Sequence, residues 1–217
     1  MGDLVEDVHL DIPLPANESK SVLIRGSYFY YHYLCDGIND AGWGCGYRTL
    51  QTICSWIKRQ LDIKKNYSAP KVPSINEIQK ALVVMGDKDL QFIGSKQWIG
   101  SLEVAFCVEY FYKIQCRIIH CRNIQELHKH VNDITQHFMD FGSPIMMGGD
   151  KDCSSKGILG ISETENGTFL LILDPHFQEH LKNREKLQSD GWIKWKNIDE
   201  LDPSSFYNLC CPLIKSN

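Results

Sequence analysis

The sequence predicts a single-domain α+β protein, because helix signals precede a group of strand signals along the chain. Its 217 residues, 43% of them hydrophobic and 23% charged, suffice for one domain with its own core. Pro13 and Pro15 limit regular structure near the start, so we expect a flexible N-terminal arm over residues 1–20. The domain itself is then expected over residues 21–217.

Charge and cysteine usage exclude several classes of protein. The net charge is −4 and the basic residues are scattered, which disfavours nucleic acid as a partner. No run of 18 apolar residues is present, and the start lacks a signal-peptide pattern, so we expect a protein of the cytoplasm or nucleus without membrane insertion. Nine cysteines without a CxxC pair indicate reduced thiols rather than disulfides or a zinc site.

The first part of the chain combines an extended segment with a strong helix signal. Residues 21–35 are rich in β-branched and aromatic side chains, which predicts extended structure. After Cys45, apolar residues recur at the spacing of one buried helix face: Leu50, Ile53, Cys54, Ile57 and Leu61. This phase places Cys45 at the N-terminus of the helix and Cys54 on its buried face.

Three further helices are predicted from capping and periodicity. Ser74 and Glu77 form a capping box for a helix that ends at Gly86. Ser101 is expected to cap a helix that runs to about residue 112, and Asn123 a long helix that ends before residue 142.

Strand signals occupy most of the remaining chain. They cover residues 113–120, 144–149, 157–163, 168–174, 191–196 and 206–214. Asn166 and Gly167 lie between two apolar runs and predict a hairpin, so the sheet should be mainly antiparallel.

Cys45 has the position of a catalytic nucleophile. A thiol at a helix N-terminus is stabilised as thiolate by the helix dipole and the free amides. Gly44 and Gly46 on either side leave room for a substrate backbone. The alternative is a structural cysteine in a turn. Cys54, on the apolar face, is expected to be an inert core residue.

A base for this thiol is found at the end of a predicted strand. If extended geometry continues through Pro175, Asp174 and His176 project to the same face, and Asp174 can orient the imidazole. The alternative is a strand that simply ends in a turn.

An oxyanion in acyl transfer needs donors, and two sources are available. One is the backbone N–H of Cys45. The other is a phenol from the segment before the loop, where the residues alone leave four candidates open: Tyr28, Tyr30, Tyr31 and Tyr33. His120 with the cysteines near it matches no structural zinc spacing, so we expect no metal.

Together these motifs resemble the ubiquitin-fold-modifier-specific cysteine proteases, peptidase family C78. The resemblance runs from about residue 28 to residue 212. It is carried by YHYLCDGINDAGWGCGYRTLQTICSW, GSKQWIGSLEV, PIMMGG followed by ILGIS, LILDPHF and FYNLC. GWGCGYR and DPH are also similar to the autophagin proteases, but GDKDLQFIGSKQWIGS favours the modifier proteases.

This resemblance implies a papain-like fold, with the nucleophile at a helix N-terminus packed on an antiparallel-leaning sheet. It implies Cys45 as nucleophile, His176 as base, Asp174 as its orienting partner and Tyr33 as the oxyanion-hole tyrosine. We expect four residues to contact the substrate: Trp43, Gly44, Gly46 and Trp98. No cofactor is implied.

The substrate that the resemblance implies is a ubiquitin-like modifier whose mature tail ends in Val-Gly. The partner would be ubiquitin-fold modifier 1, both as a precursor with a short C-terminal extension and as conjugates, and we expect the protease to be a monomer. Two alternatives are an autophagin-like protease acting on an autophagy modifier and a catalytically silent modifier-binding module. The chain resembles the short form of the family, and its segment 148–160 is unusually long and polar.

Overall fold

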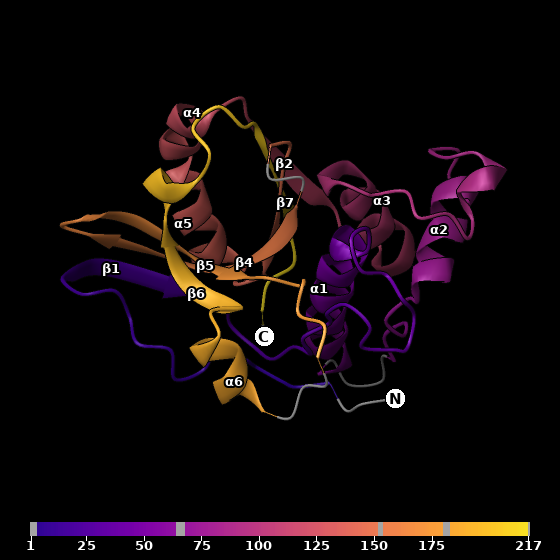
Figure 1. Ribbon diagram of the computed structural model, residues 1–217, viewed down its shortest axis with the longest axis horizontal. Coiled ribbons are helices and arrows are strands. Elements are labelled where there is room, and N and C mark those ends of the chain that lie inside the picture. Colours follow the sequence, from indigo (N-terminus) through magenta and orange to yellow (C-terminus); the bar gives the residue numbers. More distant parts are fainter. Residues whose placement is uncertain (1–3, 64–67, 152–153, 180–182, 217) are drawn as a thin grey trace.

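A seven-stranded antiparallel sheet is the framework of the computed structural model, which describes residues 4–63, 68–151, 154–179 and 183–216 (Figure 1). The strand order is β2-β7-β3-β4-β5-β6, and β1 pairs with the second half of β4, beyond the stretch that pairs with β3. The strands are β1 Glu18–Leu23, β2 Cys116–Cys121, β3 Ile145–Gly149, β4 Ser155–Thr164, β5 Gly167–Leu173, β6 Ile193–Asn197 and β7 Tyr207–Pro212.

Helices pack around this sheet, with α1, α2 and α3 gathered on one side of the molecule and α4 and α5 on another (Figure 1). Their bounds are α1 Cys45–Asp62, α2 Ile75–Val84, α3 Ser101–Tyr112, α4 Ile124–Lys129, α5 Val131–Asp140 and α6 Arg184–Ser189. In the part of the chain that the structure describes, none of the helices has the length and apolar character needed to cross a membrane.

Helix α1 lies in the middle of the protein, between β3 and β4 of the sheet on one side and α3 on another. The apolar face expected from the sequence is confirmed, since Leu50, Cys54 and Ile57 are fully buried. The polar side is buried as well, because the segment before the helix runs along it. Ser55 Oγ accepts the N–H of Phe29 (2.9 Å), and Thr52 Oγ1 accepts the N–H of Tyr31 (3.0 Å).

Those hydrogen bonds explain why residues 24–33 do not form the expected strand. Ile24 N–H still bonds Leu159 O of β4, but the backbone of residues 29–31 bonds side chains of α1 and the N-terminal segment. An isolated bridge joins Phe29 to Glu6. The strand itself is β1, which ends at Leu23.

A buried ion-pair network fixes the loop that precedes Cys45. Arg48, fully buried in the first turn of α1, donates from Nε to Asp40 Oδ2 at 2.7 Å and forms a two-pronged contact with Asp36 (2.7 and 2.9 Å). Asp40 is also fully buried, and its Oδ1 accepts the N–H of Leu34 at 2.8 Å. The loop is therefore joined to the helix by the fully buried pair of Arg48 and Asp40 and by Asp36, whose side chain is 19% exposed.

The described part of residues 1–20, where we expected a flexible arm, packs against the domain. Val8 is fully buried, and backbone hydrogen bonds join Asp7 N–H to Tyr28 O (3.1 Å) and Tyr30 N–H to Val5 O (2.9 Å). Gln188 on α6 donates to the carbonyls of Val8 and Leu10. The burial of Val8 in the core and the backbone hydrogen bonds around it hold this segment in place, although the two prolines limit its regular structure.

The predicted helices are confirmed with three corrections. The N-cap of α3 is Gly100, and Ser101 Oγ donates instead to Asn208 O at 2.8 Å. The long helix after Asn123 is interrupted at His130 (φ −96°, ψ 6°), which ends α4 and begins α5. Helix α6 was not expected, because its six residues include only one buried apolar side chain, Leu187, and so show no periodicity.

We predict that Arg48→Met lowers the free energy of unfolding by about 3–5 kcal/mol, because it leaves the carboxylate of Asp40 buried without its cation. Urea unfolding followed by circular dichroism measures this loss. Lys58→Met on the same helix is the control, since its ion pair with Asp62 is exposed to solvent. Equal losses for the two variants would contradict the proposed importance of the network.

Candidate active site

Cys45 is the first residue of α1, and only 6% of its surface is exposed. Its sulfur is hydrogen-bonded to the side chains of His176 and Tyr33 and to the backbone N–H of Ser155. Burial is the largest single influence and opposes the thiolate, but these hydrogen bonds and the charge of His176 outweigh it. Together they hold the pKa of Cys45 below its ordinary value.

Asp174 and His176 follow directly after β5, whose apolar residues fix the end of the strand in the core. Asp174 Oδ1 accepts the backbone N–H of His176 at 3.0 Å and is also hydrogen-bonded to His176 Nδ1. The first bond is that of an Asx turn, in which an aspartate bonds the backbone two residues on. The pairing expected from the sequence is present, but a turn makes it, and extended geometry does not continue through Pro175.

The charges of this pair favour an imidazolium. Burial alone lowers the pKa of a histidine, yet the hydrogen bonds to Asp174 and Cys45 raise the pKa of His176 to about 9. The pKa of Asp174 stays below its ordinary value despite burial, because His176 bonds it and the ammonium of Lys156 lies 3.9 Å from its Oδ2. Since Nδ1 is held by Asp174, Nε2 is the ring nitrogen left for Cys45.

The structure distinguishes among the four candidate tyrosines. Tyr33 is 2% exposed, contacts the sulfur of Cys45 and packs edge-on against His176, with ring centroids 5.0 Å apart. Tyr30 donates its O–H to the carbonyl of Asp174 at 2.5 Å. Tyr28 lies against His9, away from the thiol. Tyr31, the fourth candidate, donates its backbone N–H to Thr52 Oγ1. Of the four tyrosines, Tyr33 is the one that is hydrogen-bonded to the nucleophile.

A groove of about 380 Å³ lies beside Cys45. Trp98 forms part of its wall, is 53% exposed, and donates from Nε1 to Gly42 O at 3.2 Å. The other lining residues come from the start of α3, from the β3–β4 connection and from the approach to β7: Ile99, Gly100, Ser101, Gly148, Gly149, Asp150, Ser154, Ser155, Phe206 and Asn208. Residues 152–153 of the polar segment 148–160 lie outside the described chain.

Trp43, Gly44 and Gly46 are not among the residues that line this groove, and their contact with the substrate stays a prediction. A Cβ on Gly44 would lie 2.0 Å from Asp40 Oδ2, and one on Gly46 would lie 2.4 Å from Ile99 O. Both glycines therefore allow close packing inside the protein. Trp43 packs edge-on against Tyr47, with its Nε1 buried.

Sequence reasoning missed three contributors to the site. Ser155 supplies a backbone N–H to the thiol, Tyr30 fixes the carbonyl of Asp174, and Lys156 faces its second carboxylate oxygen. The contact between Lys156 and Asp174 joins the start of β4 to the end of β5. The pairing of these strands, which brings the two residues together, follows from the register of the sheet. The aromatic segment did mark Tyr30, but nothing in its spacing separates it from Tyr33.

The other thiols have a different environment. Cys54 is fully buried, as expected from its helical phase, and burial raises its pKa well above the ordinary value. Burial likewise raises the pKa of Cys107 to about 12. Among the described residues, no three His, Cys, Asp or Glu side chains are arranged to hold a metal ion. Of these three thiols, Cys45 is the one whose surroundings stabilise a thiolate.

This arrangement has the parts required for acyl transfer by a thiol. A stabilised thiolate lies next to an imidazolium that can return a proton to a leaving group. The Tyr33 O–H lies at the sulfur, and the N–H of Cys45 is in the first turn of α1, where amides lack intrahelical acceptors. Both are donors of the kind that a developing oxyanion requires.

Comparisons with known proteins agree with this geometry. Residues 19–210 match peptidase family C78. Over 211 residues the chain is 44% identical to the mouse Ufm1-specific protease 1, covering 96% of this chain and 94% of that protein. It is 38% identical to a probable Ufm1-specific protease 1 of Drosophila melanogaster, covering 95% of this chain and 86% of the relative.

A solved structure extends the comparison to the fold. The crystal structure of UfSP from C. elegans superimposes with a TM-score of 0.82 at 34% identity, covering 99% of this chain and 38% of that one. The expected α+β, papain-like fold is therefore confirmed. On the family match, the sequence identities and the shared fold, this chain belongs to peptidase family C78.

Proposed function

We propose that this chain is a thiol protease that cleaves after the C-terminal glycine of ubiquitin-fold modifier 1. It would mature the modifier precursor and release the modifier from conjugated proteins. The observation that carries the proposal is the thiol of Cys45, hydrogen-bonded at once to His176 and Tyr33. The relatives in mouse and fly, whose names give them as Ufm1-specific proteases, supply the substrate.

In the proposed reaction the Cys45 thiolate attacks the carbonyl carbon of the terminal glycine. The Tyr33 O–H and the Cys45 N–H hold the oxyanion of the tetrahedral intermediate. As the C–N bond breaks, His176 gives its proton to the leaving amine, and a thioester remains on Cys45. Water then attacks the thioester, its proton passes to His176, and the modifier leaves with a free carboxylate while the thiolate is restored.

Asp174 and Tyr30 act in this scheme by positioning. Asp174 holds Nδ1 of His176, which keeps Nε2 directed to Cys45 throughout the cycle. Tyr30 in turn fixes the backbone of Asp174 through its carbonyl. Trp98, on the groove wall, is proposed to contact the tail of the modifier, where a terminal glycine needs no space for a side chain.

Two other functions remain less well supported. An autophagin-like protease would share the Cys45 and Asp-Pro-His elements, but the similar proteins named above are Ufm1-specific. A silent modifier-binding module would not need a thiol of lowered pKa beside a histidine of raised pKa. Cys45 and His176 form such a pair. Activity as a monomer in the cytoplasm is part of the proposal.

We predict that Cys45→Ser lowers kcat for the modifier precursor by at least about 10³-fold while binding of the modifier persists, since only the nucleophile is lost. Cys54→Ser is the matched control on the same helix and should remain active in the fraction that folds. Turnover by gel assay and binding by calorimetry measure the two effects. Loss of turnover in a folded Cys54→Ser protein would contradict the assignment.

The pH dependence of kcat/KM should be bell-shaped. Activity rises on the acidic side as the Cys45 thiol ionises, and it falls near pH 9 as His176 loses the proton needed by the leaving amine. Asp174→Asn removes the partner that favours the imidazolium, so the alkaline limb should move to lower pH. An alkaline limb that is unchanged in Asp174→Asn would show that this pair does not control it.

Covalent capture separates the candidate functions. A modifier tail that ends in an electrophilic vinyl group should label Cys45 of the wild type and not of Cys45→Ser, as intact mass spectrometry will show. Equivalent probes built on ubiquitin-fold modifier 1 and on an autophagy modifier are compared at equal concentration. Labelling only by the autophagy probe supports the autophagin reading, and binding without labelling supports the silent module.

A further inference from the structure

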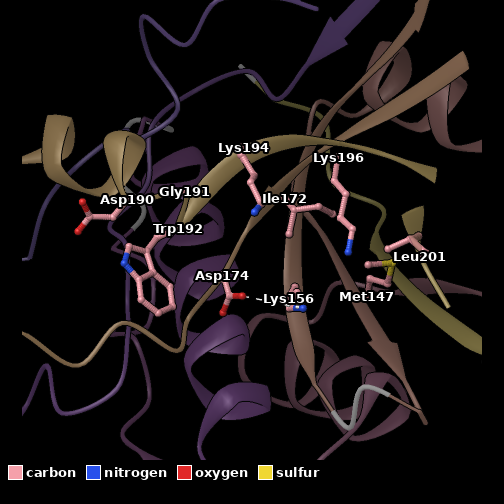
Figure 2. Close-up of a pocket in the computed structure, with 10 residues that line it drawn as sticks. All are labelled: Met147, Lys156, Ile172, Asp174, Asp190, Gly191, Trp192, Lys194, Lys196 and Leu201. Carbon is pink, nitrogen blue, oxygen red and sulfur yellow. Dashed lines mark ion pairs between the residues drawn. The ribbon is translucent and has the colours of Figure 1, made fainter. Parts of the chain in front are cut away.

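A second cavity, of about 290 Å³, borders the catalytic carboxylate on the side away from the groove of Cys45. Figure 2 shows Lys194 and Lys196 extending from the same strand, with Lys156 beside Asp174. Lys194 and Lys196 are two residues apart on β6, and alternation along a strand places both on one face of the sheet. Met147, Ile172 and Leu201 add apolar surface to the lining.

The cavity carries excess positive charge in a protein whose net charge is −4. Of its two acidic residues, Asp174 is bonded to His176, and Asp190 is paired with Lys186 at 2.7 Å. The ion pairs found among the described residues include none with Lys194 or Lys196. These two ammonium groups therefore face the cavity without a carboxylate of their own.

The two cavities lie on opposite faces of the sheet at β3 and β4. Ser155 and Gly148 line the groove of Cys45, whereas the next residue along β4, Lys156, and its partner on β3, Met147, line the lysine cavity. Both cavities meet the sheet where β3 ends and β4 begins, and the lysine cavity also reaches the end of β5.

The chemistry assigns a part of the substrate to each side. The acyl group becomes bonded to the sulfur of Cys45 and so belongs in the groove with Trp98. The leaving amine takes its proton from His176, which Asp174 holds, so the released polypeptide lies on the side of His176 and Asp174. A cavity that touches Asp174 and not Cys45 is placed to meet that polypeptide.

We propose that the lysine cavity is a leaving-side subsite that binds carboxylate groups of the polypeptide released by cleavage. Lys194 and Lys196 attract the carboxylate, and the apolar lining accepts the stem of an aspartate or glutamate side chain. The carboxylate can come from a C-terminal extension or from the conjugated protein. This inference rests on the proposed proteolytic function.

The test compares matched substrates that differ only beyond the cleaved bond. The modifier is fused to a short extension that contains either glutamates or glutamines, and kcat/KM is measured at low and high salt. Wild-type protein should prefer the acidic extension by about five- to tenfold at low salt, and less at high salt because ions screen exposed charges. The double variant Lys194→Gln/Lys196→Gln should lose this preference.

The control variant, Lys20→Gln/Lys80→Gln, removes two exposed lysines that do not line either cavity and should keep the preference. A second arm uses modifier joined by an isopeptide bond to carrier peptides with acidic or amide flanks. A preference in one arm identifies the source of the carboxylate. Absence of any preference in both arms, or its persistence in Lys194→Gln/Lys196→Gln, overturns the subsite.

A third substrate separates this inference from the proposed function. The modifier with a fluorogenic amine at its terminal glycine has no leaving polypeptide, so all four lysine substitutions should leave its kcat/KM unchanged. If the wild type does not cleave this substrate, the proposed function fails. If it cleaves this substrate but shows no charge preference with the extensions, only the subsite fails.

Discussion

The ion pair between Arg48 and Asp40 is the interaction on which the geometry of the site depends. Both side chains are fully buried, and each holds a different part of the nucleophile loop. Arg48 belongs to α1, while Asp40 accepts the N–H of Leu34 through its side chain and the N–H of Gly44 through its carbonyl. The pair thereby joins the segment that carries Tyr33 to the helix that carries Cys45. Removing either charge leaves the other buried without a partner, so breaking this pair alone is strongly destabilising.

A second constraint brings the base to this helix. The exit of β5 is held by Tyr30, which bonds the carbonyl of Asp174, and by Tyr33, whose backbone N–H bonds the carbonyl of Pro175 at 3.0 Å. The aromatic segment therefore lies between the two catalytic units and contacts both. Its own position depends on Ser55 and Thr52 of α1, and on the N-terminal residues that pack against Tyr28. The N-terminal segment is in this way part of the support of the site.

Sequence predicted the parts of the site that depend on local pattern, and missed those that depend on long-range pairing. The phase of α1 distinguished the buried Cys54 from Cys45 at the helix N-terminus. The Asp-Pro-His element identified His176 as the base and Asp174 as its partner. The choice of Tyr33 came from family resemblance, because four tyrosines in one extended segment have equivalent propensity. Lys156 and Ser155 were missed because their roles arise from β4 lying beside β5 and α1. The packing role of Gly46 was missed, since the contact that excludes a side chain there comes from Ile99, which is distant in sequence.

The contact of Gly46 with the carbonyl of Ile99 has a consequence for how the groove behaves. A Cβ on Gly46 would lie 2.4 Å from Ile99 O and 2.9 Å from Ile99 Cγ1, so the residue after the nucleophile lies directly against the residue after Trp98. Because Gly46 has no side chain, the helix of Cys45 packs directly against the segment that carries Trp98. The width of the groove at the point of bond cleavage is then a property of main-chain geometry. Adaptation to different substrates is left to the indole ring itself and to the opposite wall.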